Sequence, residues 1–275
     1  MEAIEKLYFL GPKGTYSEVA SEKIKDILNF KNETVEVSTI TKIAQLVNQN
    51  PTTMAIMPIE NSIEGIVRPT IDSLYSTDVK IQAQIDIKVE HCIASFGKKE
   101  EIKHIVSHPQ ALAQCSLYIS QEFDENIELI SANSTSEALH SLLKKDKTYA
   151  AIGRYDIAKK LNLNIIDTNI GDIKENRTRF VLVSKTKIPL KKDDRTSIVF
   201  NTKNESGALL KILEIFKKYN LNLVYIESRP SKKVFGEYNF FVDVDKGYDE
   251  IIEAIAEIKK ECNFYKLLGS YPVIH

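Results

Sequence analysis

Short apolar runs alternate with amphipathic stretches over residues 1–187. The runs at 7–10 and 54–57 predict strands, and helical patterns follow them from about Thr15 and Thr70. The Ile- and Val-rich segment 79–93 predicts one long strand. Such alternation predicts a mostly parallel sheet covered on both faces, with ligands beyond the carboxyl ends of the strands. Further strands are expected at residues 102–106, 127–131 and 149–152, and further helices from Pro109, Thr135 and Tyr155.

The pattern changes after residues 186–195, a charged segment with one proline that is typical of a linker. We expect strand, helix, strand, strand, helix and strand beyond it, at residues 196–202, 207–219, 222–230, 234–244, 247–260 and 263–270. This βαββαβ order is the ferredoxin-like arrangement. The sequence therefore predicts two domains, at residues 1–187 and 195–275.

Charge and composition narrow the class of protein. The 275 residues include 37 basic and 38 acidic ones, for a net charge of −1, so no field attracts nucleic acid or a membrane surface. No apolar run approaches the ~20 residues of a membrane span, and the first residues lack a signal-peptide profile. Three widely spaced cysteines and unpaired histidines indicate reduced thiols, a cytoplasmic protein and no metal site.

Polar residues cluster where expected strands give way to helices. Thr15 with Glu18, and Ser134 with Glu137, predict capping boxes, and Pro109 fits the first turn of a helix. Free N–H groups at a helix start bind carboxylates well. Three such starts at one crevice would suit a ligand with more than one carboxylate.

Two further segments carry candidate chemistry. Glu60, Asn61 and Ser62 follow an apolar strand and offer carboxylate, amide and hydroxyl groups to a polar substrate. In the segment 176–180, Arg179 suits a carboxylate, and the Thr178 hydroxyl can donate to a departing group. From their chemistry alone, an ordinary turn and a solvated strand start remain open alternatives.

Taken together, these segments resemble the prephenate dehydratase family over essentially the whole chain. The motifs are Gly-Pro-x-Gly-Thr-aromatic-Ser at 11–17, Pro-x-Glu-Asn-Ser-x-x-Gly-x-Val at 58–67, His-Pro-Gln-Ala-Leu-x-Gln at 108–114, and Thr-Arg-Phe at 178–180, with Thr70, Asp72, Asp172 and Asn176. The resemblance implies a two-lobed, periplasmic-binding-protein-like α/β body. The sequence Gly-Arg-Tyr-Asp at 153–156 departs from the small residues usual in the family, which leaves the details of the cleft wall open.

The second domain resembles an ACT domain, a module that binds amino acids between its copies. Two segments match the phenylalanine-site motifs of the family, Gly207-Ala208-Leu209 and Glu227-Ser228-Arg229-Pro230. The resemblance implies L-phenylalanine as an effector and a homodimer or homotetramer.

By resemblance, the chain is expected to be a carbon–oxygen lyase of L-phenylalanine biosynthesis. It would convert prephenate to phenylpyruvate, water and CO2 without cofactor or metal, under allosteric inhibition by L-phenylalanine. Thr178 is expected at the leaving hydroxyl, with Arg179 and Glu60 as further catalytic residues, Glu60 as a proton source if burial raises its pKa. The residues expected to bind substrate are Thr15, Ser17, Asn61, Ser62, Gln110, Ser134, Thr135, Asn176 and Phe180.

Two alternatives remain at this stage. An arogenate dehydratase would use the same scaffold on the aminated substrate. A sensor without activity could combine a ligand-binding body with the ACT domain, although the presence of Thr178, Arg179 and Phe180 counts against it. The first motif begins so early that we expect no fused chorismate mutase domain.

Overall fold

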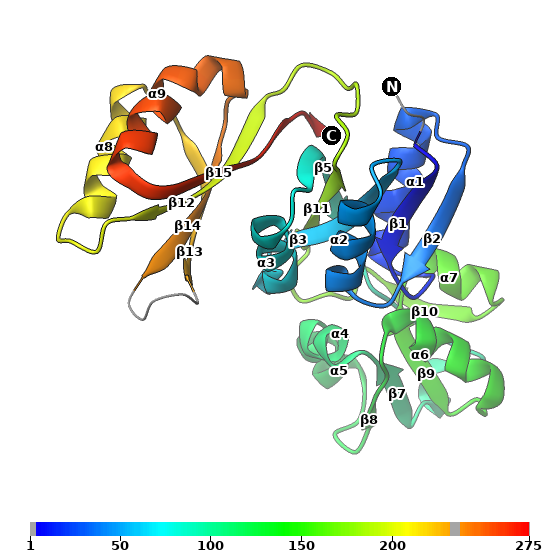
Figure 1. The fold of residues 1–275 in the computed structure, drawn as a ribbon. Coiled ribbons are helices and arrows are strands. Elements are labelled where there is room, and N and C mark those ends of the chain that lie inside the picture. Colours follow the sequence, from blue (N-terminus) through cyan, green and yellow to red (C-terminus); the bar gives the residue numbers. More distant parts are fainter. Residues whose placement is uncertain (1–3, 232–236, 275) are drawn as a thin grey trace.

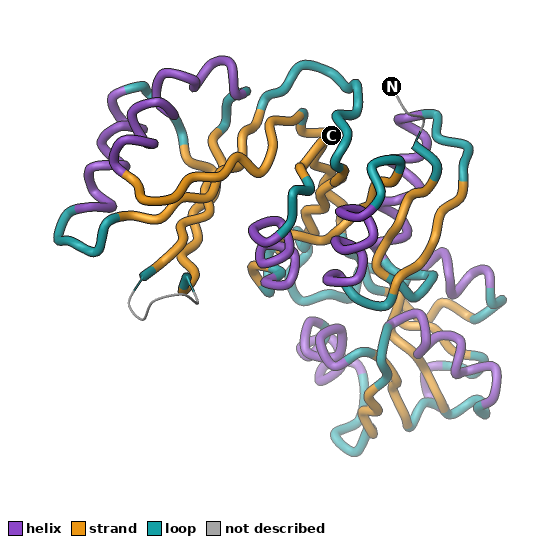
Figure 2. Tube along the Cα trace, viewed as in Figure 1, coloured by secondary structure: helices purple, strands orange, loops and turns teal. Residues whose placement is uncertain are grey.

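The computed structural model describes residues 4–231 and 237–274, which form three β-sheets with helices packed against them (Figures 1 and 2). Two sheets make the two lobes of an α/β body, and the third belongs to the C-terminal domain. The predicted two-lobed body and the ferredoxin-like domain are both confirmed. In the described part of the chain, no helix is long and apolar enough to span a membrane.

The first lobe is built on the sheet β16-β5-β11-β3-β1-β2, with β4 beside β3. Helix α1 packs on one face through Ala20 and Ile24, while α2 and α3 pack on the other through Ile43 and Ile71. The bounds are β1 Lys6–Leu10, α1 Tyr16–Leu28, β2 Glu33–Val37, α2 Ile40–Gln49, β3 Thr53–Asn61, β4 Gly65–Ile66, α3 Arg68–Ser76, β5 Lys80–Lys88, β11 Arg177–Ser184 and β16 Val273–Ile274.

The second lobe is built on the sheet β10-β6-β9-β7-β8. Helices α4 and α5 cover one face and α6 and α7 the other, each through its own apolar cluster. The bounds are β6 Cys92–Ser95, β7 His104–Ser107, α4 Pro109–Gln114, α5 Ser116–Glu122, β8 Glu128–Ser131, α6 Thr135–Ser141, β9 Tyr149–Gly153, α7 Tyr155–Lys160 and β10 Asn164–Thr168, with short 3-10 helices at Lys99–Glu101 and Leu142–Lys144.

Two expectations about these sheets were wrong. The body holds two mixed sheets rather than one mostly parallel sheet, since β11 runs antiparallel to both β3 and β5, and β6 runs antiparallel to β9 and β10. The predicted strand 79–93 is two strands, because β5 ends at Lys88 and the chain crosses to the other lobe before β6. The return crossing lies beside it, where Val89 N–H donates to Asn176 O at 2.8 Å.

The C-terminal domain has the predicted βαββαβ order and an antiparallel sheet, β13-β14-β12-β15. Its helices cover one face, and its other face packs on the first lobe, where Phe241 and Leu268 share a core cluster with Ile59 and Ile71 (Figure 1). The bounds are β12 Arg195–Thr202, α8 Ala208–Lys218, β13 Leu223–Pro230, β14 Tyr238–Val244, α9 Tyr248–Glu261 and β15 Cys262–Tyr271. Residues 234–236 of the predicted strand lie outside the described residues.

Candidate active site

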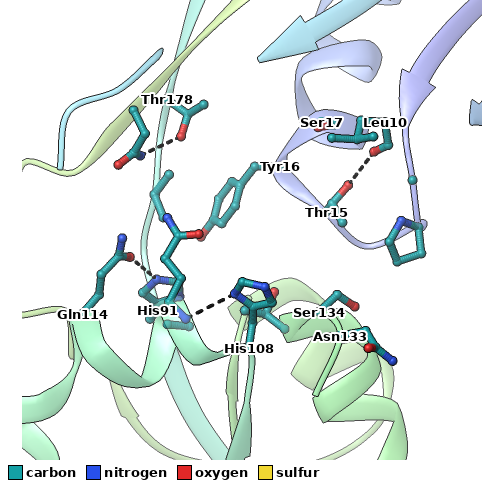
Figure 3. Close-up of a pocket in the computed structure, with 17 residues that line it drawn as sticks. Leu10, Thr15, Tyr16, Ser17, His91, His108, Gln114, Asn133, Ser134 and Thr178 are labelled. Carbon is teal, nitrogen blue, oxygen red and sulfur yellow. Dashed lines mark hydrogen bonds between the residues drawn. The ribbon is translucent and has the colours of Figure 1, made fainter. Parts of the chain in front are cut away.

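A cleft of about 340 Å³ lies between the two lobes (Figure 3), a volume within the usual range for small-molecule sites. The first lobe contributes the loop before α1 and the ends of β3 and β11. The crossing segment and the starts of α4 and α6 supply the remaining walls. The lining residues are Leu10, Gly11, Pro12, Thr15, Tyr16, Ser17, Asn61, Val89, His91, His108, Gln110, Ala111, Gln114, Asn133, Ser134, Thr135 and Thr178.

Three helix starts meet at this cleft, as the sequence predicted, although the capping differs. Ser134 Oγ accepts from Glu137 N–H at 3.0 Å, but the Glu137 carboxylate accepts from Asn133 Nδ2 and does not close the box. At α1 the predicted box is absent, because Thr15 Oγ1 donates to Leu10 O. Thr15 therefore leaves the first-turn N–H groups of α1 available to a bound anion.

Thr178 and Asn61 form a cross-strand pair at the cleft end of β11 and β3. Asn61 Nδ2 lies 2.9 Å from Thr178 Oγ1, and Asn61 Oδ1 accepts the backbone N–H groups of Ile63 and Glu64 at 3.0 Å each. These contacts orient the Asn61 amide so that it donates to the Thr178 oxygen. The hydroxyl hydrogen of Thr178 is then free to point into the cleft.

A second layer of polar side chains holds this pair. Asn176 Oδ1 accepts from Asn61 Nδ2 at 2.8 Å, and Asn176 Nδ2 donates to Gln114 Oε1 at 3.2 Å. His91 Nε2 is also 3.2 Å from Gln114 Oε1, so it carries the proton. Burial lowers the pKa of His91 and so favours the neutral imidazole, while the hydrogen bond with Gln114 acts in the opposite direction.

The described residues that line the cleft include no Asp, Glu, Lys or Arg. A cation does lie behind one wall, where Arg154 Nη1 donates to Thr15 O at 2.9 Å and the guanidinium is 5.6 Å from the centre of the Tyr16 ring. Arg154 is held by Asp156 at 2.6 and 3.0 Å, so the unusual segment 153–156 supports the wall. An anion here would be bound by hydroxyl, amide and backbone N–H donors. No three His, Cys, Asp or Glu of the described chain are grouped to hold a metal ion.

Glu60 and Arg179, for which catalytic roles were expected, are not among the residues that line the cleft. Successive residues of a strand face opposite sides of a sheet, so the pair beside Asn61 and Thr178 faces the C-terminal domain. There Arg179 Nη1 lies 3.1 Å from Glu60 Oε2 and 3.4 Å from Asp243 Oδ2.

Three expected substrate-binding residues also lie outside the cleft lining. Phe180 is buried in the core of the first lobe near Phe9. Asn176 is buried behind Asn61, and the exposed Ser62 is hydrogen-bonded to the backbone of Arg177 at 2.9 Å. The other expected residues, Thr15, Ser17, Asn61, Gln110, Ser134 and Thr135, do line it together with Thr178.

The sequence reasoning missed several lining residues. His108 and Gln114 were within the 108–114 motif, and their position there was a usable signal. Tyr16 reaches across to the crossing segment, where its hydroxyl contacts the backbone N–H and carbonyl of Glu90. Nothing in the sequence marked His91 as a cleft residue. The predicted continuous strand 79–93 concealed the crossing between lobes, and this crossing places His91 in the cleft.

The two expected effector motifs lie apart within one chain. Gly207, Ala208 and Leu209 line a pocket of about 350 Å³ at the start of α8. Residues 227–230 end the edge strand β13 and do not line that pocket; among them, Arg229 Nη2 lies 3.3 Å from Asp72 Oδ1 on α3. One chain therefore presents the two motifs on separate surfaces.

Comparison with known proteins gives a consistent result. The family model for prephenate dehydratase matches residues 7–188, and that for the ACT domain matches residues 196–262. The chain is 39% identical over 268 residues to the prephenate dehydratase of Methanocaldococcus jannaschii, covering 95% of this chain and 96% of the relative. A crystal structure of Arthrobacter aurescens prephenate dehydratase in complex with L-Phe is similar with a TM-score of 0.83 and 29% identity, covering 97% of this chain and 90% of the other. The Staphylococcus aureus enzyme gives a TM-score of 0.83 and 27% identity, with coverage of 97% and 99%.

Proposed function

Since the chain belongs to the prephenate dehydratase family, we propose that its interlobe cleft converts prephenate to phenylpyruvate, water and CO2. The observation that carries this assignment to particular atoms is the Asn61–Thr178 pair, which presents one hydroxyl to a cleft walled by three helix starts. Prephenate carries two carboxylates and a ring hydroxyl, and the cleft offers donors for the carboxylates on one side and Thr178 for the hydroxyl on the other.

The reaction requires two bonds to break across one ring. The bond between the ring and its carboxylate breaks and releases CO2, its electron pair moves through the ring, and the ring hydroxyl departs with growing negative charge and takes a proton from solvent to become water. Aromatisation of the ring drives the step. The protein must hold the ring carboxylate and the hydroxyl in the reactive geometry, and positioning of this kind can lower the barrier by several kcal/mol, roughly 7–11 in the best cases.

Thr178 suits the leaving hydroxyl as a hydrogen-bond donor. A threonine hydroxyl is a weak acid, so its contribution is a hydrogen bond that strengthens as the leaving oxygen gains negative charge. The Asn61 amide, which donates to Thr178 Oγ1, fixes the direction of that bond. Tyr16, His91 and His108 are the titratable side chains among the described lining residues.

Binding of the carboxylates follows from the neutral cleft. Ser17, Ser134 and Thr135 stand at the starts of α1 and α6, where backbone N–H groups and helix dipoles favour negative charge. Gln110 adds an amide at the start of α4. A cleft without fixed cations holds the dianion through oriented dipoles, and the product, which keeps only one carboxylate, makes fewer of these contacts.

Turnover of the purified chain tests this function. Incubation with prephenate should yield phenylpyruvate, measured by the absorbance of its enolate in alkali, together with stoichiometric CO2. A parallel incubation with arogenate should yield phenylalanine more slowly. Absence of phenylpyruvate from a folded, monodisperse preparation would refute the assignment, and faster turnover of arogenate would make the chain an arogenate dehydratase.

The ACT domain supports a regulatory proposal as well. L-phenylalanine would bind at Gly207, Ala208 and Leu209 of one chain and at residues 227–230 of a second copy, because one chain keeps these motifs apart. The active protein would then be a homodimer or homotetramer with symmetric contacts. Inhibition should be cooperative, and the coupling should be typically about 1–3 kcal/mol. With free cysteines at 92, 115 and 262, we place this activity in the cytoplasm.

A further inference from the structure

A charged cluster lies within the apolar contact between the C-terminal sheet and the first lobe. Arg179 of β11 stands between two carboxylates, Glu60 of β3 at 3.1 Å and Asp243 of β14 at 3.4 Å. The Asp243 carboxylate is buried, and so is the C-terminal domain's side of the contact, where Phe241 and Leu268 join the core of the first lobe. An ion pair in such surroundings is poorly screened by solvent or salt.

Asp243 is fixed from its own domain. Ser197 Oγ of β12 donates to Asp243 Oδ1, and the same hydroxyl lies 2.6 Å from Tyr271 Oη of β15. Three neighbouring strands of the C-terminal sheet thus converge on one carboxylate, whose other oxygen faces Arg179. Burial raises the pKa of Asp243, while Ser197 and Arg179 act in the opposite direction.

The partner of Asp243 is the residue next to Thr178. Thr178 faces the cleft and Arg179 faces the C-terminal domain. Because the two residues share a peptide unit, a displacement of the Arg179 side chain that turns this unit would also turn the Thr178 hydroxyl. The pairing of β11 with β3 changes register between Arg179 and Phe180, which places a bulge beside the pair. A bulge interrupts the hydrogen-bond ladder and bends the strand, so that it changes the direction of the side chains beside it.

We propose that Asp243 is a positioning residue for the dehydratase reaction, holding Thr178 toward the leaving hydroxyl through Arg179. The orientation of the C-terminal sheet is thereby coupled to the geometry of the cleft. This inference rests on the proposed function and adds a residue from the regulatory domain to the machinery that supports catalysis. An effector that rotates the C-terminal sheet would act on Thr178 through the same contact.

A further contact between the domains reaches β3 indirectly, through helix α3. Lys266 Nζ of β15 donates to the carbonyls of Leu74 and Tyr75 at the end of α3, at 2.9 and 2.8 Å. Thr70 near the start of α3 donates its hydroxyl to Pro58 O of β3. The C-terminal sheet is therefore connected to β3 through α3 and to β11 through Asp243, so a change in its orientation would act on both strands that carry Asn61 and Thr178.

The test is Asp243→Asn, which keeps the volume and the Ser197 contact but replaces the carboxylate oxygen that accepts from Arg179 with an amide NH2 group. We expect kcat to fall about 10- to 100-fold, as for a small displacement of a catalytic group. KM should stay within about threefold, because carboxylate binding rests on the helix starts. L-phenylalanine should still bind by calorimetry but inhibit the residual activity less than in the wild type. Asp245→Asn is the matched control, since Asp245 is exposed and pairs loosely with Arg195 at 3.7 Å, and it should behave as wild type.

Hydrogen–deuterium exchange at residues 177–180 measures how Asp243 affects the stability of β11, and it does not depend on enzyme activity. Faster exchange there in Asp243→Asn, but not in Asp245→Asn, supports the inference. Wild-type kcat, wild-type inhibition and unchanged exchange in Asp243→Asn would overturn it. If this variant does not fold, Ser197→Ala decides, with an expected kcat loss of about three- to tenfold for a weakened hydrogen bond; unchanged kcat in folded Ser197→Ala would equally overturn the inference. If the wild-type chain makes no phenylpyruvate, the proposed function fails, and the exchange result still answers whether Asp243 controls β11.

Discussion

Asn61 Nδ2 lies 2.9 Å from Thr178 Oγ1 across the antiparallel strands β3 and β11. The amide donates, so the threonine hydroxyl is left as a donor toward the cleft. This direction of the hydrogen bond lets two neutral side chains stabilise an oxygen that leaves with negative charge.

Removing the Thr178 hydroxyl should affect the chemical step. We expect Thr178→Ala to lower kcat by about 10²-fold or more, since a positioned donor to a leaving group contributes in this range. KM should change little, because the interaction is made in the transition state. Steady-state kinetics with prephenate measure both values. Thr178→Ser keeps the hydroxyl and should retain much of the turnover; equal activity of the alanine variant would remove Thr178 from the mechanism.

Asn61→Asp reverses the polarity of the pair at constant shape. Its carboxylate would accept from the Thr178 hydroxyl, so the hydroxyl would no longer donate to the leaving group, and kcat should fall about as far as in Thr178→Ala. A double-mutant cycle checks whether the two residues act as a unit: in the Thr178→Ala background, Asn61→Asp should cost little further kcat. Losses that multiply would show that Asn61 acts independently of Thr178.

Gly207 allows a clean test of the effector pocket. Its φ of +80° is in the left-handed region, and a Cβ there would meet nothing within 4 Å. Asparagine tolerates this conformation, so Gly207→Asn adds bulk to the pocket with little backbone strain. We expect weaker L-phenylalanine binding by calorimetry, by about tenfold or more, and kcat near the wild-type value without effector. Unchanged affinity would place the effector elsewhere.

His91 should make stability depend on pH. Its pKa is lowered below the ordinary value of 6.5, so the unfolded chain binds a proton more readily than the folded chain. The stabilisation is therefore present above about pH 6.5 and is lost as pH falls through the folded-state value. Urea unfolding at about pH 8 and about pH 5.5 should show a smaller acid loss for His91→Gln than for the wild type. Identical losses would mean that the pKa of His91 is the same in the folded and the unfolded chain.

The reaction should need no bound metal, because aromatisation supplies its driving force. Exhaustive dialysis against a chelator should leave kcat unchanged. The same preparation assayed with added Mg²⁺ or Zn²⁺ is the control, and activity that is lost on chelation and returns with metal would contradict the prediction.

The sequence was most informative where a local pattern decides the structure. The order of elements in the C-terminal domain followed from periodicity, and Thr15, Ser134 and Gln110 were found because a polar residue at a strand-to-helix junction is a local signal. By contrast, residues 33–49, which form β2 and α2, were not predicted, although α2 buries Ile43 and Val47. Strand β2 has no fully buried residue, and only two of its five residues, Val35 and Val37, are apolar.

Errors at the site came from information that is not local. Thr178 and Arg179 are adjacent in sequence, and which of them faces the cleft depends on how β11 pairs with β3. The motif suggested that the whole Thr-Arg-Phe segment contacts substrate, whereas strand geometry separates its members onto two faces. His91 depended on where the chain leaves one sheet for the other, and a run of apolar residues contains no mark of that crossing.

The path of the chain after β15 has a consequence for engineering. After Tyr271 the chain returns to the first lobe, and β16 pairs in parallel with β5. The outgoing and returning segments are joined, since Val273 N–H donates to Asp194 Oδ1 at 2.8 Å and Asp194 N–H donates to Tyr271 O at 3.2 Å. A domain joined to its neighbour by one segment can rotate about several axes. Two connecting segments that are hydrogen-bonded to each other restrict it to rotation about a single axis. Transplanting this regulatory module by simple end-to-end fusion would leave out the second connecting segment, and with it the fixed axis.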